Sequence, residues 1–574
     1  MTASEDSRSW NSRGLNQLGK QTVQKDPFRY HMVRVVLVSL SIVLVARVLM
    51  LHTVERDFLQ DQGDARTVRT EKIFAHRGMI QDRQGKPLAI SSPVGSIWAD
   101  PKKLIQADDG LAALAMALGV EATTFEDRLL SNQDRDFIYL RRHLPPLQVD
   151  KILSLSLAGV YVQREYHRFY PAGEVTAQVL GFTNIDDEGQ EGLELAFDDW
   201  LRGTPGKKKV LKNLYGQIVR DIKPIRSAEE GRTLALSLDL RVQYHAYREL
   251  KTAMKRYKAE SGSIVILDVV NGEVLAMVNQ PSFNPNDRSS LQAAFVRNRA
   301  VTDLFEPGST VKPFTLAVAL QSGEYAPHTK IDTAPGFIRV DDKMISDPSN
   351  RGVLDVASVI SKSSQVGITK IALSLNEQDM WNMFHELGLG QITGAGFPGE
   401  SAGYLPNRRN WNDIERATFA YGYGLSVTPL QLARAYLVIA SGGVKKQISL
   451  VKRSAQSPQR VLDEKVAKQV LQILERVVTQ GTGRRAKVDS YTVAGKTGTV
   501  RKVGASGYDT THHLAFFVGV TPVSDPRLVA VVLINDSKSD EFGGGSIAAP
   551  VFSRVMTGAL RLLNIPPDDF KKAA

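Results

Sequence analysis

A long, mostly apolar segment near the N-terminus constrains the fold of this chain more than any other feature. Residues 32–51 are almost entirely Val, Leu, Ile, Met, Ala and Ser, and about 20 such residues cross a bilayer as an α-helix. No small-residue cleavage site follows Leu51, so we interpret the segment as an uncleaved anchor. Arg34 and Arg47 lie near its two ends, where their side chains can reach the interfaces. The basic tail 1–31 predicts a cytoplasmic N-terminus and an extracytoplasmic chain after the anchor.

Length and composition then limit the kind of protein and the chemistry. A chain of 574 residues and 63.2 kDa exceeds a single core, so we expect two to four domains. The net charge of +11 would suit an anionic partner, but no basic run carries the interleaved aromatic residues of a nucleic-acid site, and we expect no nucleic-acid partner. Cysteine is absent, which excludes disulfides, thiolate metal sites and cysteine nucleophiles. The reactive groups must therefore be oxygen and nitrogen.

The pattern of apolar residues predicts two modules after the anchor. Residues 52–232 mix short strands and helices and predict an N-terminal α+β module. A second domain starts at 233, where apolar runs around Asn271-Gly272 predict a hairpin. Runs at 513–520 and 528–534 add strands, and the stretch between is mostly helical. We expect this domain to end at 565, before a short tail, 566–574.

Ser309 and Lys312 form the candidate reactive pair. Pro307-Gly308 predicts a turn that ends in a helix start at Ser309, and residues three apart share a helix face, so the Lys312 amine can reach the Ser309 hydroxyl. Lysine accepts a proton only when neutral, so its usual pKa of ~10.4 must fall through burial and a second nearby cation. The spacing alone arises about twice by chance in a chain of this size. The alternative is a capped helix with an exposed lysine.

Two further motifs follow in order. Ser363 begins Ser363-Ser364-Gln365, and Lys496-Thr497-Gly498 lies on an apolar run. Ser-x-x-Lys, a Ser-x-Asn-like element and Lys-Thr-Gly, in that order, are the signature of the penicillin-recognising serine enzymes. Lys496 also supplies the second cation. With segments 76–78, 168–173, 305–314 and 421–426, the chain resembles the class B penicillin-binding proteins, within them the division type called penicillin-binding protein 3, over nearly all of its length after the tail.

The resemblance implies a fold, a location and partners. The expected fold is α+β: an antiparallel sheet of about five strands between helices, on an N-terminal pedestal or dimerisation-type module with one transmembrane helix. The implied enzyme is anchored in the bacterial inner membrane, has a periplasmic catalytic domain and crosslinks peptidoglycan at the septum. Implied partners are stem peptides and the lipid II polymer, β-lactams as inhibitors, and the lipid-II polymerase with other division membrane proteins. No cofactor or metal is implied.

The resemblance also assigns roles to residues. Ser309 would attack the D-Ala-D-Ala bond with Lys312 as general base, and Ser363 would pass a proton between the lysines and the leaving amine. Lys496 and Thr497 would bind the terminal carboxylate. The backbone N–H groups of Ser309 and Thr499 would form the oxyanion hole. The catalytic set is therefore Ser309, Lys312, Ser363 and Lys496, and the substrate-binding set is Gln365, Thr497, Gly498 and Thr499.

One position departs from the family pattern, which has Asn where this chain has Gln365. The extra methylene moves the amide by more than about 1 Å, enough to spoil a contact at a reacting centre. The chain could be the main division enzyme or a condition-specific paralogue. The alternatives are a D,D-carboxypeptidase or β-lactam-hydrolysing enzyme, in which water replaces the acceptor amine, and a catalytically weakened division scaffold.

Overall fold

The structure is a computed structural model that describes residues 27–106, 110–212, 218–289, 291–407, 411–452, 458–504 and 507–569. Most of the predicted N-terminal tail and residues 570–574 of the predicted C-terminal tail lie outside these ranges. The chain divides into two compact units, Met1–Lys72 with Lys207–Arg226 and Ile73–Gly206 with Ser227–Ala574. Each unit is described by itself.

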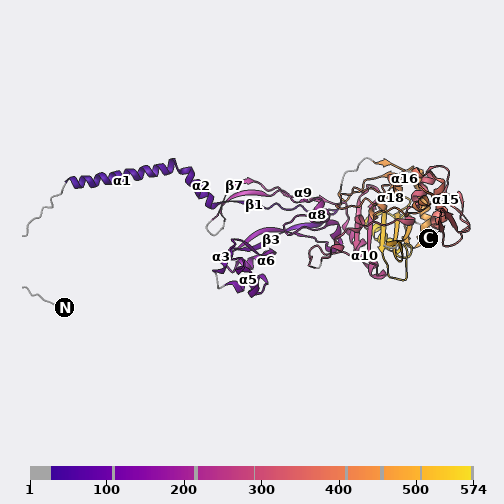
Figure 1. The fold of residues 1–574 in the computed structure, drawn as a ribbon, viewed down its shortest axis with the longest axis horizontal. Helices are drawn as coiled ribbons and strands as arrows, with labels where there is room; N and C mark the ends of the chain where they lie inside the picture. The colour runs from indigo at the N-terminus through magenta and orange to yellow at the C-terminus, as the bar shows by residue number, and fades with distance from the viewer. Residues whose placement is uncertain are drawn as a thin grey trace, which may run out of the picture. The chain divides into compact units, whose positions relative to one another are not determined.

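The first unit carries the predicted membrane helix. Helix α1 (Pro27–Thr53; Figure 1) contains an 18-residue window with a mean hydropathy of 2.4, and among the described residues it alone is long and apolar enough to cross a membrane. It extends beyond the predicted 32–51 at both ends, because the flanking residues are also compatible with a helix. Arg47 donates to Glu55 at 2.9 Å beyond the end of α1, as expected of a cation that reaches out of the apolar zone.

A short helix and a three-stranded sheet complete the first unit. Helix α2 (Arg56–Thr67) leads into β1 (Val68–Ile73), which lies beside β6 (Gly206–Lys212) and β7 (Ile218–Arg226) in the order β1-β6-β7. The lysine cluster at 207–209 lies on β6, which pairs antiparallel with β7. Every residue of β7 is exposed.

The N-terminal part of the second unit is the predicted mixed α+β module. Its sheet has the order β4-β3-β2-β8, with β5 paired to β3. The helices after β3 cover a small core that includes Leu104 and Leu114. The elements are β2 (Ile80–Gln81), β3 (Pro87–Ala99), α3 (Pro101–Ile105), α4 (Leu111–Leu118), α5 (Ala122–Leu130), β4 (Ile138–Leu144), α6 (Pro146–Leu153), β5 (Val160–Phe169), η2 (Gly173–Val175), α7 (Ala177–Leu180), α8 (Gly192–Ala196), α9 (Asp198–Leu201) and β8 (Leu234–Ala235).

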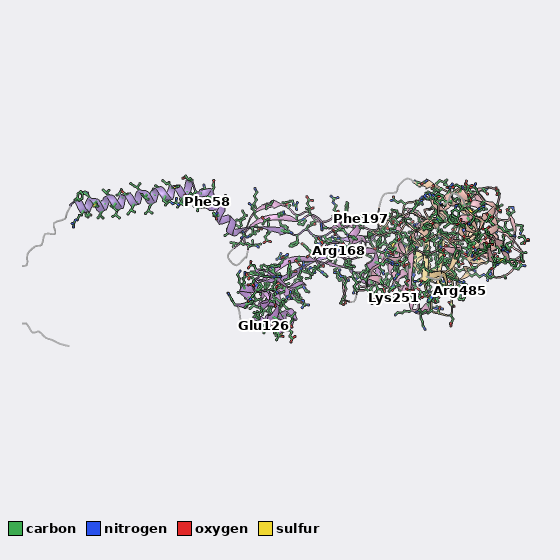
Figure 2. The ribbon with its side chains drawn as sticks, in the orientation of Figure 1. Phe58, Glu126, Arg168, Phe197, Lys251 and Arg485 are labelled. Atoms are coloured by element: carbon green, nitrogen blue, oxygen red, sulfur yellow. The ribbon has the colours of Figure 1, made fainter. Side chains whose placement is uncertain are left out.

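A buried network of charges links the elements of this module. Arg77 donates through Nε to Glu194 at 2.8 Å and through Nη1 to Asp198 at 2.6 Å. Arg168, labelled in Figure 2, donates to the other oxygen of Glu194 at 2.6 Å. Two guanidinium groups therefore share one fully buried carboxylate. His76 donates through Nε2 to the Ser91 carbonyl at 3.1 Å. These contacts give Arg77 and Glu194 a structural role in the module.

The rest of the second unit is built on the predicted five-stranded antiparallel sheet, in the order β10-β9-β19-β18-β17. Its strands are buried on both faces, and successive side chains alternate between two cores. Ile264 and Ile266 of β9 join the core under α10 and α20, whereas Val265 and Leu267 join the core under α13 and α18. The strands are β9 (Ser261–Asp268), β10 (Val274–Gln280), β17 (Ala494–Gly504), β18 (Gly507–Thr521) and β19 (Leu528–Asn535). The predicted hairpin and the two late strands are confirmed.

Helices and short hairpins fill the remainder of this domain. They are α10 (Leu240–Tyr257), α11 (Ala293–Val296), α12 (Arg299–Thr302), η3 (Gly308–Val311), α13 (Lys312–Gln321), β11 (Lys330–Asp332), β12 (Phe337–Val340), β13 (Lys343–Ser346), β14 (Val353–Asp355), α14 (Val356–Ser361), α15 (Gln365–Ser374), α16 (Glu377–Glu386), α17 (Asp413–Ala420), α18 (Pro429–Ala440), β15 (Val444–Lys445), β16 (Gln459–Arg460), α19 (Glu464–Thr479), η4 (Arg484–Ala486) and α20 (Ala548–Leu562).

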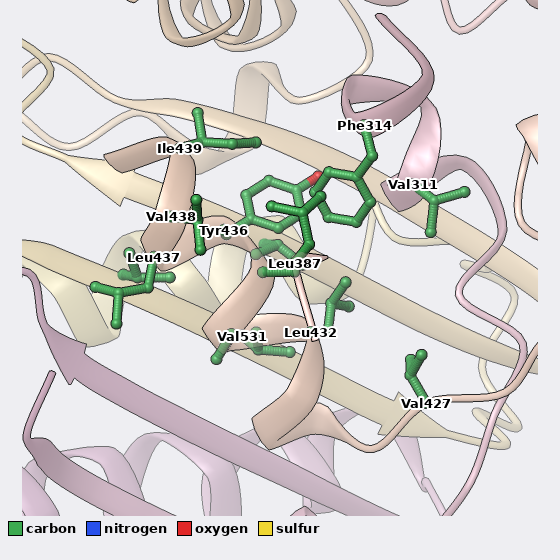
Figure 3. Close-up of a cluster of buried hydrophobic side chains, with 14 of the residues drawn as sticks. Val311, Phe314, Leu387, Val427, Leu432, Tyr436, Leu437, Val438, Ile439 and Val531 are labelled. Atoms are coloured by element: carbon green, nitrogen blue, oxygen red, sulfur yellow. The ribbon is translucent and has the colours of Figure 1, made fainter. Parts of the chain in front are cut away.

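Two buried helices support the segment that carries Ser309. All residues of α18 are buried, as is α13 from Lys312 to Leu320. Figure 3 shows Phe314 of α13 beside Tyr436 of α18, with ring centroids 5.5 Å apart. The Tyr436 hydroxyl donates to the carbonyl of Thr310 at 2.7 Å. The packed core of α13 and α18 therefore stabilises the turn that carries Ser309.

Candidate active site

Ser309 lies in η3, one 3-10 turn directly before α13. The sequence predicted this position at a helix start, and Ser309 is the second residue of η3, whose N-cap is Pro307. The Gly308 N–H donates to the Gly422 carbonyl at 3.0 Å. A Cβ at Gly422 would lie 2.2 Å from the Gly308 oxygen, so only glycine allows this close approach. The Gly422 turn therefore supports the backbone that presents the Ser309 hydroxyl.

Lys312, the first residue of α13, is completely buried. Its Nζ donates to the Ser363 carbonyl at 2.8 Å, to the Ser363 hydroxyl at 3.3 Å and to the Ser364 carbonyl at 3.3 Å. The spacing predicted that this amine can reach the Ser309 hydroxyl; among the described residues, no hydrogen bond joins the two. The Ser363 hydroxyl instead donates to Ser309 Oγ at 3.2 Å. The Lys312 amine is hydrogen-bonded to Ser363 and Ser364. A proton can therefore move between Ser309 and Lys312 through the Ser363 hydroxyl.

The two lysines have strongly altered pKa values. Burial, followed by the charge of Lys496, lowers the pKa of Lys312 well below its ordinary value, while Asp347 opposes the shift. Burial alone lowers the pKa of Lys496 to about 7. Lys496 Nζ donates to Ser363 Oγ at 3.0 Å and to the Thr497 carbonyl at 3.2 Å. The second cation that the sequence required is therefore present, and the Ser363 hydroxyl contacts Ser309 and both lysines.

A carboxylate that the sequence did not reveal holds the turn at Ser363. Ser363 has a positive φ of 57°, which is strained for a serine. Asp347 accepts from the Ser364 hydroxyl at 2.5 Å, from Gln365 N at 2.5 Å and from Val366 N at 3.3 Å. An anion is favourable at the N-terminus of a helix, here α15. Asp347 therefore anchors the turn that positions Ser363, and it also lies near enough to influence the pKa of Lys312.

The Lys-Thr-Gly segment lies on β17 at the edge of the sheet. The Thr497 and Thr482 hydroxyls lie 2.8 Å apart, and the Thr499 hydroxyl accepts from the Gly544 N–H at 3.0 Å. A Cβ at Gly498 would lie 1.9 Å from a carbon of the Phe516 ring, so the position requires glycine. Thr482 and Gly544 were not predicted, since neither stands in a recognisable motif.

Gln365 begins α15 and is half-buried. Its backbone N–H donates to Asp347. Within the described residues, its side-chain amide has no hydrogen-bond partner. The structure thus brings Ser309, Lys312, Ser363 and Lys496 together, with Thr497, Gly498 and Thr499 on the adjoining strand, and leaves the Gln365 amide unattached.

Two family models match most of the chain. The penicillin-binding protein transpeptidase domain matches residues 262–557, and the penicillin-binding protein dimerisation domain matches residues 72–236. The transpeptidase match contains all the residues of the candidate active site around Ser309. The second covers the module with the Arg77–Glu194 network.

Curated relatives align over nearly the full length. The chain is 43% identical over 532 residues to the peptidoglycan D,D-transpeptidase FtsI of Escherichia coli, covering 92% of this chain and 90% of the relative. It is 40% identical over 550 residues to the probable peptidoglycan D,D-transpeptidase PbpC of Pseudomonas aeruginosa, covering 96% of this chain and 97% of the relative.

Solved structures agree with these relatives. Penicillin-binding protein 3 of Mycobacterium tuberculosis, solved with aztreonam, matches with a TM-score of 0.68 at 26% identity, over 87% of this chain and 98% of its own. The transpeptidase domain of Burkholderia pseudomallei penicillin-binding protein 3 matches with a TM-score of 0.54 at 42% identity, over 58% of this chain and 97% of its own. The fold expected from the sequence is confirmed. The chain therefore belongs to the class B penicillin-binding proteins, as a serine-type peptidoglycan D,D-transpeptidase of the penicillin-binding protein 3 type.

Proposed function

We propose that this enzyme crosslinks peptidoglycan stem peptides at the division septum through an acyl-enzyme on Ser309. One observation carries the proposal: the Ser363 hydroxyl lies within hydrogen-bond distance of Ser309 Oγ and of the amines of Lys312 and Lys496. A buried, neutral lysine linked to a serine through one hydroxyl is a means of activating that serine. The similarity to FtsI supports the role in division.

In the proposed first step, Ser309 Oγ attacks the carbonyl of the penultimate D-alanine in a donor stem. The Ser309 proton passes through Ser363 to Lys312 and then to the departing amine, so the peptide bond breaks and free D-alanine leaves. An amine of a second stem then attacks the ester, which forms the crosslink and restores Ser309. We assign Lys496 and Thr497 to the substrate carboxylate, and the N–H groups of Ser309 and Thr499 to the oxyanion. We keep Gly498 in the proposed substrate-binding set as part of the Lys-Thr-Gly strand, where its missing Cβ makes room for the Phe516 ring.

We further propose that β-lactams acylate Ser309. Solved structures of the similar Mycobacterium tuberculosis protein are described as complexes with aztreonam and with ampicillin. A β-lactam opened by Ser309 would leave an ester that no amine removes, so the label would be long-lived.

The proposed topology places α1 in the bacterial inner membrane, the N-terminus in the cytoplasm and the catalytic domain in the periplasm. The apolar helix and the basic residues ahead of it support this arrangement. We propose that the chain is divided into a cytoplasmic tail (1–31), an anchor (32–51), a pedestal (52–232), a transpeptidase domain (233–565) and a C-terminal tail (566–574). The proposed partners are a lipid-II polymerase and other division membrane proteins. We propose no nucleic-acid partner.

Polymerised lipid II offered to the detergent-solubilised full-length enzyme tests the proposal. We expect crosslinked muropeptides with release of D-alanine, and neither product from Ser309→Ala. D-Alanine release without crosslinks would identify a carboxypeptidase. A wild-type protein that forms neither product and takes no penicillin label would be a scaffold.

The acylation rate should depend on pH through both lysines. The Lys496 pKa of about 7 means that its positive charge is lost as the pH rises through 7, so binding of the substrate carboxylate should weaken above that pH. Lys312 acts as a base only when neutral, so acylation should also slow as the pH falls through its lowered pKa. We expect a bell-shaped kcat/KM profile, with about a tenfold loss per pH unit on each limb.

Stopped-flow acylation by nitrocefin measures the profile, and Lys496→Arg, which stays charged, should lose the alkaline limb. An alkaline limb retained in that variant would refute the assignment.

Asp347→Ala should slow acylation about 100-fold, the scale of a 1 Å displacement at a reacting group. The change leaves two N–H groups of α15 without their acceptor and frees the turn that carries Ser363. Acylation of the variant by nitrocefin gives the rate. Asp342→Ala is the matched control, since that carboxylate is 99% exposed and should leave the rate unchanged. Equal rates for the two variants would show that Asp347 does not position Ser363.

Gln365→Asn should change the acylation rate by about tenfold or more. The shorter side chain places its amide more than about 1 Å closer to the backbone, a distance that matters at a reacting centre. The Gln365 amide has no partner to lose among the described residues. Penicillin labelling of the two proteins side by side gives the ratio, and identical rates would show that the position does not affect acylation.

A further inference from the structure

A small cavity of about 190 Å³ lies within the second unit, and none of the residues assigned to the Ser309 site lines it. Its walls come from β4, β5, the turn at 183–187 and the segment at 285–288 after β10. It therefore lies where the dimerisation-type module contacts the transpeptidase domain. The lining combines apolar side chains such as Ile185 and Pro285 with polar and charged ones, which include His143, His167, Arg168, Asp187, Asn286 and Arg288.

Three buried atoms in this lining, Arg168 Nη2, Asp187 Oδ1 and His143 Nε2, lack hydrogen-bond partners within the described part of the chain. Arg168 has a 1% exposed side chain, whose Nε and Nη1 donate to Glu194 and Ser91 while Nη2 has no acceptor. Asp187 Oδ1 is buried and receives no donor. An unmade hydrogen bond to a buried charged group costs more than about 1–3 kcal/mol. His143 Nε2 lies 3.5 Å from a Glu165 oxygen. The cavity therefore offers an unpaired guanidinium N–H at Arg168 and an unpaired carboxylate oxygen at Asp187.

The charges around the cavity are also incompletely paired. Arg288 donates to the Thr183 carbonyl at 2.9 Å and its guanidinium lies 4.6 Å from the centre of the Phe182 ring. It forms no ion pair with any carboxylate in the described ranges. Burial raises the pKa of Asp187 to about 6, so this carboxylate is charged at neutral pH. A cation and a carboxylate thus line the same cavity without contacting each other.

These features match a ligand that carries both a carboxylate and an ammonium group. Arg168 Nη2 and the Arg288 charge suit the carboxylate, and Asp187 Oδ1 suits the ammonium group. The volume corresponds to about six water molecules at ~30 Å³ each, room for roughly six heavy atoms but not for a stem peptide. We propose that the cavity binds a small zwitterionic amino acid, with D-alanine as the ligand. The choice of D-alanine rests on the proposed function, because the reaction at Ser309 releases one D-alanine for each acyl-enzyme.

Equilibrium dialysis of radiolabelled D-alanine against the full-length protein tests the inference. The experiment uses enzyme whose Ser309 has first been acylated by aztreonam, so that the active site is blocked, at a pH of about 7.5, above the Asp187 pKa. We expect saturable binding of one D-alanine per chain. Asp187→Asn and Arg288→Gln should each weaken it at least tenfold. Asparagine tolerates the positive φ at position 187, so the first variant should fold.

Matched controls separate charge pairing from a general loss of charge. Asp186→Asn removes the neighbouring carboxylate, which is 62% exposed, pairs with Arg142 and does not line the cavity, and it should bind D-alanine as the wild type does. Acetate and methylamine each carry half of the zwitterion and should compete at least tenfold more weakly. Absence of saturable binding would overturn the inference and leave a cavity filled by water. Acetate as effective as D-alanine would overturn it in favour of an anion site.

Failure of D-alanine to bind in the cavity can be distinguished from failure of the proposed function. If aztreonam does not label Ser309, the proposed function fails, and dialysis with unlabelled wild type and Asp187→Asn still decides the cavity. Binding that disappears on acylation and is insensitive to Asp187→Asn would place D-alanine in the active site and refute the second site.

Discussion

The Lys312→Gln variant should be acylated by β-lactams about 10⁴-fold more slowly than the wild type, the upper range for loss of a general base. Lys312 is completely buried, and its pKa is lowered by burial and by Lys496, so it can hold the proton that Ser309 gives up. Glutamine keeps a donor for the carbonyls of Ser363 and Ser364 but cannot take a proton at neutral pH. Stopped-flow acylation by nitrocefin measures the rate constant directly.

Lys362→Gln is the matched control for this variant. Lys362 lies one residue before Ser363, yet its side chain is exposed, so its removal should leave acylation within about twofold. Circular dichroism should give the same spectrum for both variants. A Lys312→Gln enzyme that acylates at the wild-type rate would exclude Lys312 as the base.

The Glu194→Ala variant should lose about 3–5 kcal/mol of stability in the N-terminal module, as expected when one partner of a buried ion pair is removed. Glu194 is fully buried and accepts from both Arg77 and Arg168. Its loss leaves two buried guanidinium groups with less compensating charge. The unfolding midpoint of this module should fall on the order of 10 °C, measured by differential scanning calorimetry of the solubilised protein.

Glu188→Ala controls for the loss of an ordinary carboxylate. Glu188 pairs with Arg202, and both side chains are about half exposed, so the change should cost no more than about 1 kcal/mol. Equal midpoints for the Glu194 and Glu188 variants would show that the buried network does not stabilise the module.

The elements predicted from sequence were those with strong periodic signals. The strands around Asn271-Gly272 and the two late strands carry unbroken apolar runs, which suit a sheet buried on both faces. The anchor was identified because a run of 20 mostly apolar residues is long enough to cross a bilayer as a helix. Its ends were less accurate, since polar residues can extend a helix beyond the bilayer.

The grouping of Ser309, Lys312, Ser363 and Lys496 followed from the order of three motifs, but the contacts within the group did not. Sequence spacing suggested a direct approach of Lys312 to Ser309, whereas the tertiary fold brings Ser363 from another turn between them. Asp347 could not be found either. Its partners lie 17 to 19 residues further along, and only the packing of β13 near α15 reveals that they meet.

Mass spectrometry of the penicillin-treated, full-length protein tests the central claim most directly. Our account predicts one penicilloyl adduct per wild-type chain, mapped by proteolysis to the peptide that contains Ser309, and no adduct on Ser309→Ala. An adduct on another residue, an adduct that persists in Ser309→Ala, or a folded wild-type protein that takes none would contradict it.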